Sequence, residues 1–248
     1  MDFKAKIEHN ARVNEPVRIN KYLAEKGLAS RREADALIDA KQVLVNGQPA
    51  QLGQKVTDAD KIEIVGKQKE KLYLAYYKAR GIITHSPAEH EIDIETQLKN
   101  DHDLSGVNPV GRLDKDSEGL IILSNDGLIT GPLLDPEAKH EKEYEVAVDK
   151  EINSPFLKRM TTGVEIEGYL TKPAKAELKN AGDKKRFVLT ITEGKKHQIR
   201  RMCAALGYQV QALKRIRIAN IKINKLKPNQ YRKITGDELK EFLTELGL

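Results

Sequence analysis

The chain of 248 residues has little of what several classes of protein need. It has a single cysteine, Cys203, and its six histidines lack the spacing of metal ligands, so we expect neither an internal disulfide nor a structural metal. No apolar run approaches the roughly 18 residues that cross a bilayer. The first residues, MDFKAKIEHNARVNEP, lack the apolar segment of a secretory signal. We therefore expect a cytoplasmic protein without a membrane partner.

Glycine-rich nucleotide loops are missing as well. The sequence contains neither a G-x-G-x-x-G element nor a Walker loop. This removes the usual sequence support for a dinucleotide, a methyl-donor or a nucleoside triphosphate site. We expect the protein to work without a cofactor.

Acidic residues are absent from a long basic tract, residues 195–233, which holds twelve Lys and Arg. Removing these twelve from the total of 43 leaves 31 basic against 37 acidic residues in the rest of the chain. A basic tract on an acidic body is typical of a protein that binds a polyanion, because each cation near a phosphate releases counterions. The alternative is a solvated basic face.

After a polar leader at 1–16, residues 17–64 have the pattern of a small domain with two helices and short strands. Apolar residues recur at helical spacing from Val17, and Gly27 ends this first helix. Ser30 and Glu33 form the capping box of a second helix. Strands are expected at 43–45 and 62–65, with Asn46-Gly47 as the hairpin turn between strands.

The polar stretch 65–71, which contains GKQKEK, is the expected linker to a larger α+β domain at 72–248. The expected strands are LYLAYYK, VGRLD, LIILS, EYEVAV and RFVLTIT. The expected helices are SPFLKRM, HQIRRMCAAL and, near the C-terminus, DELKEFLTEL.

The segment GRLDKDSEGLIILSNDG, residues 111–127, places charged side chains at the start of a buried strand. The run Leu-Ile-Ile-Leu lies between Gly119 and the turn residues that follow it, which is typical of a strand buried on both faces. Carboxylates held next to such a rigid element are candidates for chemistry. From the residues alone, Asp114 and Asp116 are equally good candidates.

The small domain resembles the RNA-binding domain named for the fourth protein of the small ribosomal subunit. The resemblance rests on its R-x-N-K-Y-L, S-R-R-E-A and V-x-V-N-G elements, although Lys41 and Ala59 depart from the usual glycines. It implies that Lys21, Arg31 and Arg32 face RNA, where arginine suits bidentate contacts with phosphate. The alternative is a pair of solvated arginines at a helix start.

Three ordered motifs resemble the pseudouridine synthases of the RsuA/RluB/RluE/RluF family, and among them the RluF type. They are G-R-L-D-x-D-S-x-G-L at 111–120, K-E-Y-E-V at 142–146 and E-G-x-x-H-Q-I-R-R-M at 193–202. The resemblance implies a mixed, largely antiparallel sheet flanked by helices. A further family element appears as YKARG, with Ala79 in place of proline, which predicts a less rigid loop there.

The resemblance also implies roles for individual residues. Asp114 would attack the sugar or base or take a sugar proton, and Tyr144 would remove the proton from the newly bonded carbon of uracil. Arg200 would hold Asp114 ionised in a dry pocket, with Ile199 as an apolar wall. Arg112 would fill the gap left by the extruded base. The other expected RNA contacts of the large domain are Lys195, Lys196, Arg201, Lys214, Arg215 and Arg217.

We expect His197 to have a structural or RNA-contacting role rather than a catalytic one. The expected substrate is ribosomal RNA, with the large subunit favoured and transfer RNA as the alternative, and we expect a monomer. Two rival interpretations stay open. A non-catalytic RNA-binding or ribosome assembly factor would keep the fold without the reaction, and an RNA methyltransferase would need a donor loop that the sequence lacks.

Overall fold

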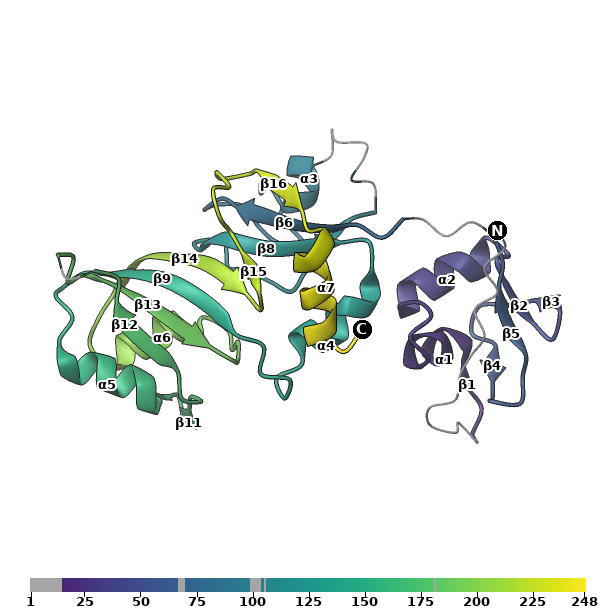
Figure 1. The fold of residues 1–248 in the computed structure, drawn as a ribbon, viewed down its shortest axis with the longest axis horizontal. Helices are drawn as coiled ribbons and strands as arrows, with labels where there is room; N and C mark the ends of the chain where they lie inside the picture. Colours follow the sequence, from purple (N-terminus) through teal and green to yellow (C-terminus); the bar gives the residue numbers. More distant parts are fainter. Residues whose placement is uncertain (1–14, 67–69, 99–103, 105, 181) are drawn as a thin grey trace. The chain divides into compact units, whose positions relative to one another are not determined.

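The computed structural model describes residues 15–66, 70–98, 104, 106–180 and 182–248 (Figure 1). The leader expected at 1–16 and part of the expected linker at 65–71 therefore lie outside the described residues. The chain forms two compact units, one running to Lys71 and including Asp126–Gly131, the other comprising Leu72–Asn125 and Pro132–Leu248. Within the described ranges, no helix is long and apolar enough to cross a membrane.

The first unit is built around two short helices. The side chain of Ser30 accepts a hydrogen bond from the Glu33 amide, and the Glu33 carboxylate accepts one from the Ser30 amide, so the predicted capping box is present. The helices and strands in this part of the chain are β1 (Val17–Arg18), α1 (Ile19–Glu25), α2 (Arg31–Asp39), β2 (Val43–Val45), β3 (Gln48–Pro49), β4 (Lys55–Val56) and β5 (Ile62–Ile64). Strand β2 lies between β3 and β5, and β1 pairs with β4.

The second unit is built on a nine-stranded sheet. Its strands are β6 (Tyr73–Lys78), β7 (Asn108–Val110), β8 (Glu118–Ser124), β9 (Lys142–Val148), β12 (Lys175–Leu178), β13 (Arg186–Ile191), β14 (Val210–Ile218), β15 (Ile221–Lys222) and β16 (Tyr231–Lys233). The main path runs β12-β13-β9-β14-β8-β6-β16, and only the β14–β8 pair of this sheet is parallel among the described strands. The predicted mixed, largely antiparallel α+β fold is thus confirmed.

Helices cover this sheet and complete its core. They are α3 (Ile94–Leu98), α5 (Ser154–Thr162), α6 (Gln198–Ala205) and α7 (Gly236–Glu245) (Figure 1). The short helix α4 (Thr130–Leu134) has residues of both units. Two short strands, β10 (Glu165–Ile166) and β11 (Tyr169–Leu170), pair with each other. Side chains of α5 and α6 join the inward-facing residues of β9 and β13 in one apolar cluster. The Leu-Ile-Ile-Leu run of β8 is fully buried, as its two-sided apolar pattern predicted.

Two local predictions for the second unit need correction. The VGRLD segment was expected to be a strand, but β7 ends at Val110, because Gly111 adopts a φ of +82° and turns the chain into a loop. The sequence predicted no strand in 210–218, yet β14 is a nine-residue strand there between β9 and β8. Its basic residues, Lys214, Arg215 and Arg217, hid the strand pattern.

Candidate functional site

Asp114 lies in the loop between β7 and β8, and the backbone of this loop is fixed at several points. The hydroxyl of Thr84 donates to the Leu113 carbonyl at 2.8 Å and accepts from the Leu113 amide at 3.1 Å. The Gly81 amide donates to the Lys115 carbonyl at 2.8 Å. The Ser117 amide closes a turn on the Asp114 carbonyl at 3.0 Å. A loop held this firmly can present a carboxylate in one orientation.

The loop borders a cavity of about 510 Å³. Its lining residues are Ile83, Thr84, Arg112, Leu113, Asp114, Lys115, Asp116, His197 and Arg200. The structure thus brings together three predicted site residues, Arg112, Asp114 and Arg200, from two distant parts of the chain. The cavity is more open than the dry pocket expected from the sequence, since the Asp114 side chain is 40% exposed.

Arg200, on α6, contacts the backbone of this loop. Its guanidinium donates to the Asp116 carbonyl at 3.0 Å and to the Val210 carbonyl at 3.3 Å. Among the described residues, the basic side chain found within 4 Å of the Asp114 carboxylate is His197, at 3.5 Å, rather than Arg200. Arg200 therefore ties α6 to the loop that carries Asp114.

Tyr144 and Ile199 belong to the apolar cluster of the second unit. Both side chains are buried, and neither is among the lining residues of the cavity. The cluster also contains Leu113, which does line the cavity and precedes Asp114 in the chain. Tyr144 therefore shares its apolar cluster with a residue that lines the cavity.

Lys78, at the end of β6, is a residue that the sequence reasoning did not single out. Its side chain is fully buried, and Nζ donates to the carbonyls of Ala79 at 3.0 Å and Ile82 at 2.7 Å. These bonds hold the loop at 79–82, where the family element has proline. Burial lowers the pKa of Lys78 to about 8, an effect that the nearby carboxylates, Asp114 first among them, oppose. The YKARG element was the available signal for this residue.

The lowered pKa of Lys78 predicts a specific pH dependence of stability. Because the folded-state pKa of about 8 lies below the ordinary value of 10.5, the unfolded chain binds more protons between these two values. The contribution of Lys78 to stability therefore increases as the pH rises through this window. We expect the unfolding free energy of the parent, relative to Lys78→Met, to increase between about pH 8 and pH 10, as measured by urea denaturation. All other titrating groups are shared and cancel, so a constant difference would contradict the prediction.

In the first unit, the three expected RNA-binding residues lie on its helices. Arg31 and Arg32 occupy the first turn of α2 and are both exposed. Lys21, on α1, is partly exposed and lies 3.5 Å from the Glu25 carboxylate in the next turn of the helix. Surface ion pairs of this kind are weak, so Lys21 stays available to a phosphate.

Several cations of the basic tract have partners within the second unit. Lys195 and Lys196 are exposed, and Lys195 lies over the ring of Tyr169 at 3.7 Å from its centroid. Arg201 pairs with Glu167, and Lys214 lies 4.9 Å from the centre of the Tyr77 ring. A cation that lies over an aromatic ring keeps its charge, so Lys195 and Lys214 remain candidates for contacts with phosphate.

Arg215 differs from the expected RNA contact because it is a buried residue. It is 5% exposed, and its guanidinium donates to the carbonyls of Leu120 at 2.7 Å and Arg112 at 3.4 Å. A buried guanidinium that is bonded to backbone carbonyls offers no open face to a phosphate. Arg215 instead holds the backbone of the loop at Arg112 through this hydrogen bond.

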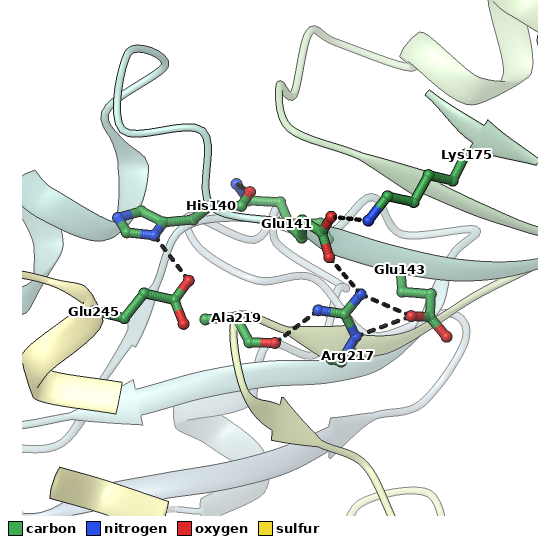
Figure 2. Close-up of polar contacts among 8 residues, drawn as sticks. His140, Glu141, Glu143, Lys175, Arg217, Ala219 and Glu245 are labelled. Carbon is green, nitrogen blue, oxygen red and sulfur yellow. Dashed lines mark hydrogen bonds and ion pairs between the residues drawn. The ribbon is translucent and has the colours of Figure 1, made fainter. Parts of the chain in front are cut away.

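Arg217 is likewise engaged within the protein. Figure 2 shows its guanidinium between Glu141, at 2.8 Å, and Glu143, at 2.9 Å from Nε, with a third bond to the Ala219 carbonyl. Two carboxylates already neutralise this cation. Both Arg215 and Arg217 were expected to contact RNA because they lie in the basic tract. The carbonyls that bind Arg215 and the carboxylates that bind Arg217 lie far away along the chain, so the sequence did not reveal them.

Comparisons with known proteins agree with this geometry. The sequence model of a family described as RNA pseudouridylate synthase matches residues 72–205, and that of the S4 domain matches residues 17–62. The first match contains the Asp114 loop, Tyr144 and Arg200.

Similar proteins align over most of the chain. A dual-specificity RNA pseudouridine synthase, RluF, of Escherichia coli K12 is 40% identical over 232 residues, covering 90% of this chain and 77% of that protein. A ribosomal large subunit pseudouridine synthase B of Bacillus subtilis is 35% identical, covering 91% of this chain and 95% of that protein. A crystal structure of a pseudouridylate synthase superposes with a TM-score of 0.67 at 27% identity, covering 93% of this chain and 99% of that one.

Proposed function

Because the chain belongs to the RNA pseudouridylate synthase family, we propose that it isomerises a specific uridine of ribosomal RNA, with Asp114 as the reacting carboxylate. The observation that carries the role of Asp114 is its place in the cavity. It shares this cavity with Arg112 and Arg200, and its loop is anchored by Thr84.

The reaction breaks the bond between N1 of uracil and C1′ of the ribose and forms a bond between C5 and C1′. The hydrogen on C5 leaves as a proton, and N1 gains a proton, so no other atom is added or lost. An ionised Asp114 begins this sequence either by attacking the sugar or base or by taking a sugar proton. We assign removal of the C5 proton to Tyr144. Its apolar cluster contains Leu113 and Ile199, the chain neighbours of Asp114 and Arg200.

A base that is stacked inside RNA must leave the stack before it can enter the cavity, at a cost of a few kcal/mol. Arg112 lines the same cavity as Asp114 and is our candidate for the side chain that fills the gap. Arg200 keeps α6 against the Asp114 loop, and Ile199 contributes to the apolar wall behind it.

RNA is held by cations of both units in this proposal. Lys21, Arg31 and Arg32 serve the first unit, and the exposed Lys195 and Lys196 serve the second, together with Arg201 and Lys214. Arg215, which is buried against backbone carbonyls, and Arg217, which is paired with two carboxylates, are excluded from this set. We place the domain boundary in 65–71 and propose a cytoplasmic monomer.

Large-subunit ribosomal RNA is the proposed substrate because one relative is a ribosomal large subunit pseudouridine synthase. The dual specificity of the Escherichia coli relative makes a second RNA class the alternative. Mapping pseudouridine across total RNA, from cells with and without this gene, tests the proposal. We expect one or a few sites to disappear from large-subunit RNA. An unchanged map would contradict the proposed reaction and favour an RNA-binding protein without catalytic activity. Losses confined to transfer RNA would show that transfer RNA, and not ribosomal RNA, is the substrate.

A further inference from the structure

His197 lies close to the side chain of Asp114. Its Nε2 lies 3.5 Å from Oδ1 of Asp114, and both residues line the same cavity. Two other cations of the cavity are bonded elsewhere: Arg200 donates to two backbone carbonyls, and Lys115 pairs with Glu91 at 2.7 Å. The third, Arg112, is the side chain to which we assign the gap left by the extruded base. His197 is therefore well placed to determine the direction in which the Asp114 carboxylate points.

The backbone of His197 adopts a conformation that favours glycine. At φ +51° and ψ 27° it is left-handed, immediately before the first residue of α6. For a residue with a Cβ this conformation costs roughly 1 to 2 kcal/mol. Strain of this kind persists where the surroundings impose it, and it is found most often at functional sites.

A set of hydrogen bonds around Gln198 imposes this conformation. The Lys195 amide donates to Oε1 of Gln198 at 2.9 Å, and the Gln198 amide donates to the Lys195 carbonyl at 3.1 Å. Nε2 of Gln198 donates to the buried carboxylate of Glu193 at 2.6 Å, which also accepts from the Tyr169 hydroxyl at 2.6 Å. This turn would keep its shape with glycine at 197, so the imidazole is not needed to build it.

We propose that His197 is a positioning residue for the isomerisation, in which Nε2 donates to Oδ1 of Asp114 and fixes the carboxylate for reaction. Both the Nε2–H tautomer and the imidazolium can make this bond. Catalytic hydrogen bonds are often long before substrate binds and shorten in the complex, which fits a starting distance of 3.5 Å. This inference rests on the proposed function of Asp114.

The test uses two variants with opposite effects on backbone and side chain. His197→Gly removes the donor and relieves the left-handed strain, whereas His197→Gln keeps a donor of similar reach and keeps the strain. The probe is RNA labelled with tritium at C5 of uridine, prepared from cells that lack the gene, and the signal is tritium released in single turnovers with excess enzyme. Filter binding gives the RNA affinity, and a thermal melt gives Tm.

We expect His197→Gly to react about 10- to 100-fold more slowly at saturating enzyme, with unchanged RNA affinity. Its Tm should be unchanged or up to about 3 °C higher, because the strain is relieved. His197→Gln should recover part of the rate at a Tm no higher than that of the parent. Activity and stability would then rank the variants in different orders, which a purely structural role does not produce.

A saturated rate within twofold of the parent for His197→Gly would overturn the inference. So would a weakened RNA affinity with an unchanged saturated rate, since His197 would then be a contact to RNA. A failure of the proposed function gives a separate result. In that case the parent itself releases no tritium from this RNA. If the parent is active and the glycine variant is equally active, only the role of His197 is contradicted.

Discussion

Asp114→Asn should bind RNA with nearly the affinity of the parent and form no measurable pseudouridine. Asparagine has almost the same volume, and the loop around it is held by backbone contacts to Thr84, Gly81 and Ser117 that do not involve the carboxylate. An amide is neither a nucleophile nor a base under these conditions, so we expect turnover to fall by roughly ten-thousandfold or more. Tritium release from C5-labelled RNA measures the rate, and filter binding measures the affinity.

Asp116→Asn is the matched control for this experiment. Asp116 lines the same cavity two residues away, and the contact it makes with Arg200 uses its backbone carbonyl, which the substitution keeps. We expect this variant to retain most of the parent's rate. Substantial turnover by Asp114→Asn would remove Asp114 from its role, and inactivity of Asp116→Asn alone would transfer that role to its neighbour.

Gly119→Ala should destabilise the second unit by about 3 kcal/mol or more, or prevent its folding. Gly119 has a φ of +110°, and a Cβ at this position would lie 2.2 Å from the Arg215 carbonyl oxygen. A clash with backbone in the middle of a sheet cannot be relieved by a rotamer change, and the strained φ adds to the cost. Urea denaturation followed by circular dichroism measures the effect.

The affected contact is the parallel pairing of β8 with β14, in which Arg215 lies opposite Gly119. This pairing also places the Arg215 guanidinium under the loop at Arg112, so activity should be lost with stability. Gly194→Ala is the control within the same unit, because a Cβ at Gly194 meets no atom within 4 Å. An unfolding midpoint for Gly119→Ala equal to that of the control would show that the close approach of the two strands is not required.

Local features were predicted well from the sequence because their causes lie within a few residues. The capping box at Ser30 and Glu33 depends on a spacing of three residues, and the buried Leu-Ile-Ile-Leu strand on its uninterrupted apolar pattern. The prediction of a strand through VGRLD was wrong. The apolar pattern continues past Gly111, but the positive φ of Gly111 turns the chain out of the strand. Strand β14 was missed for the opposite reason, since its basic residues masked a pattern of alternating burial.

The candidate site divides in the same way. The ordered motifs were enough to select Asp114, Tyr144 and Arg200 as a group and to indicate the family. They did not indicate that Arg200 is bonded to backbone carbonyls or that the His197 ring lies 3.5 Å from the Asp114 carboxylate. The contacts of Arg200 with Asp116 and of His197 with Asp114 join segments more than eighty residues apart, and no local spacing encodes them.

By itself, the sequence determined the family, the candidate residues for the chemistry, and the presence of a tract with twelve basic and no acidic residues. Only the tertiary structure decided which of those charges are free. Arg215 and Arg217 are basic in the sequence, yet carbonyls and carboxylates from other strands surround them, and Lys78 is a cation buried near Asp114. The physical reason is that burial and neighbouring groups decide whether a cation can bind a phosphate and what its pKa is. Both are set by strands that meet only in the folded sheet.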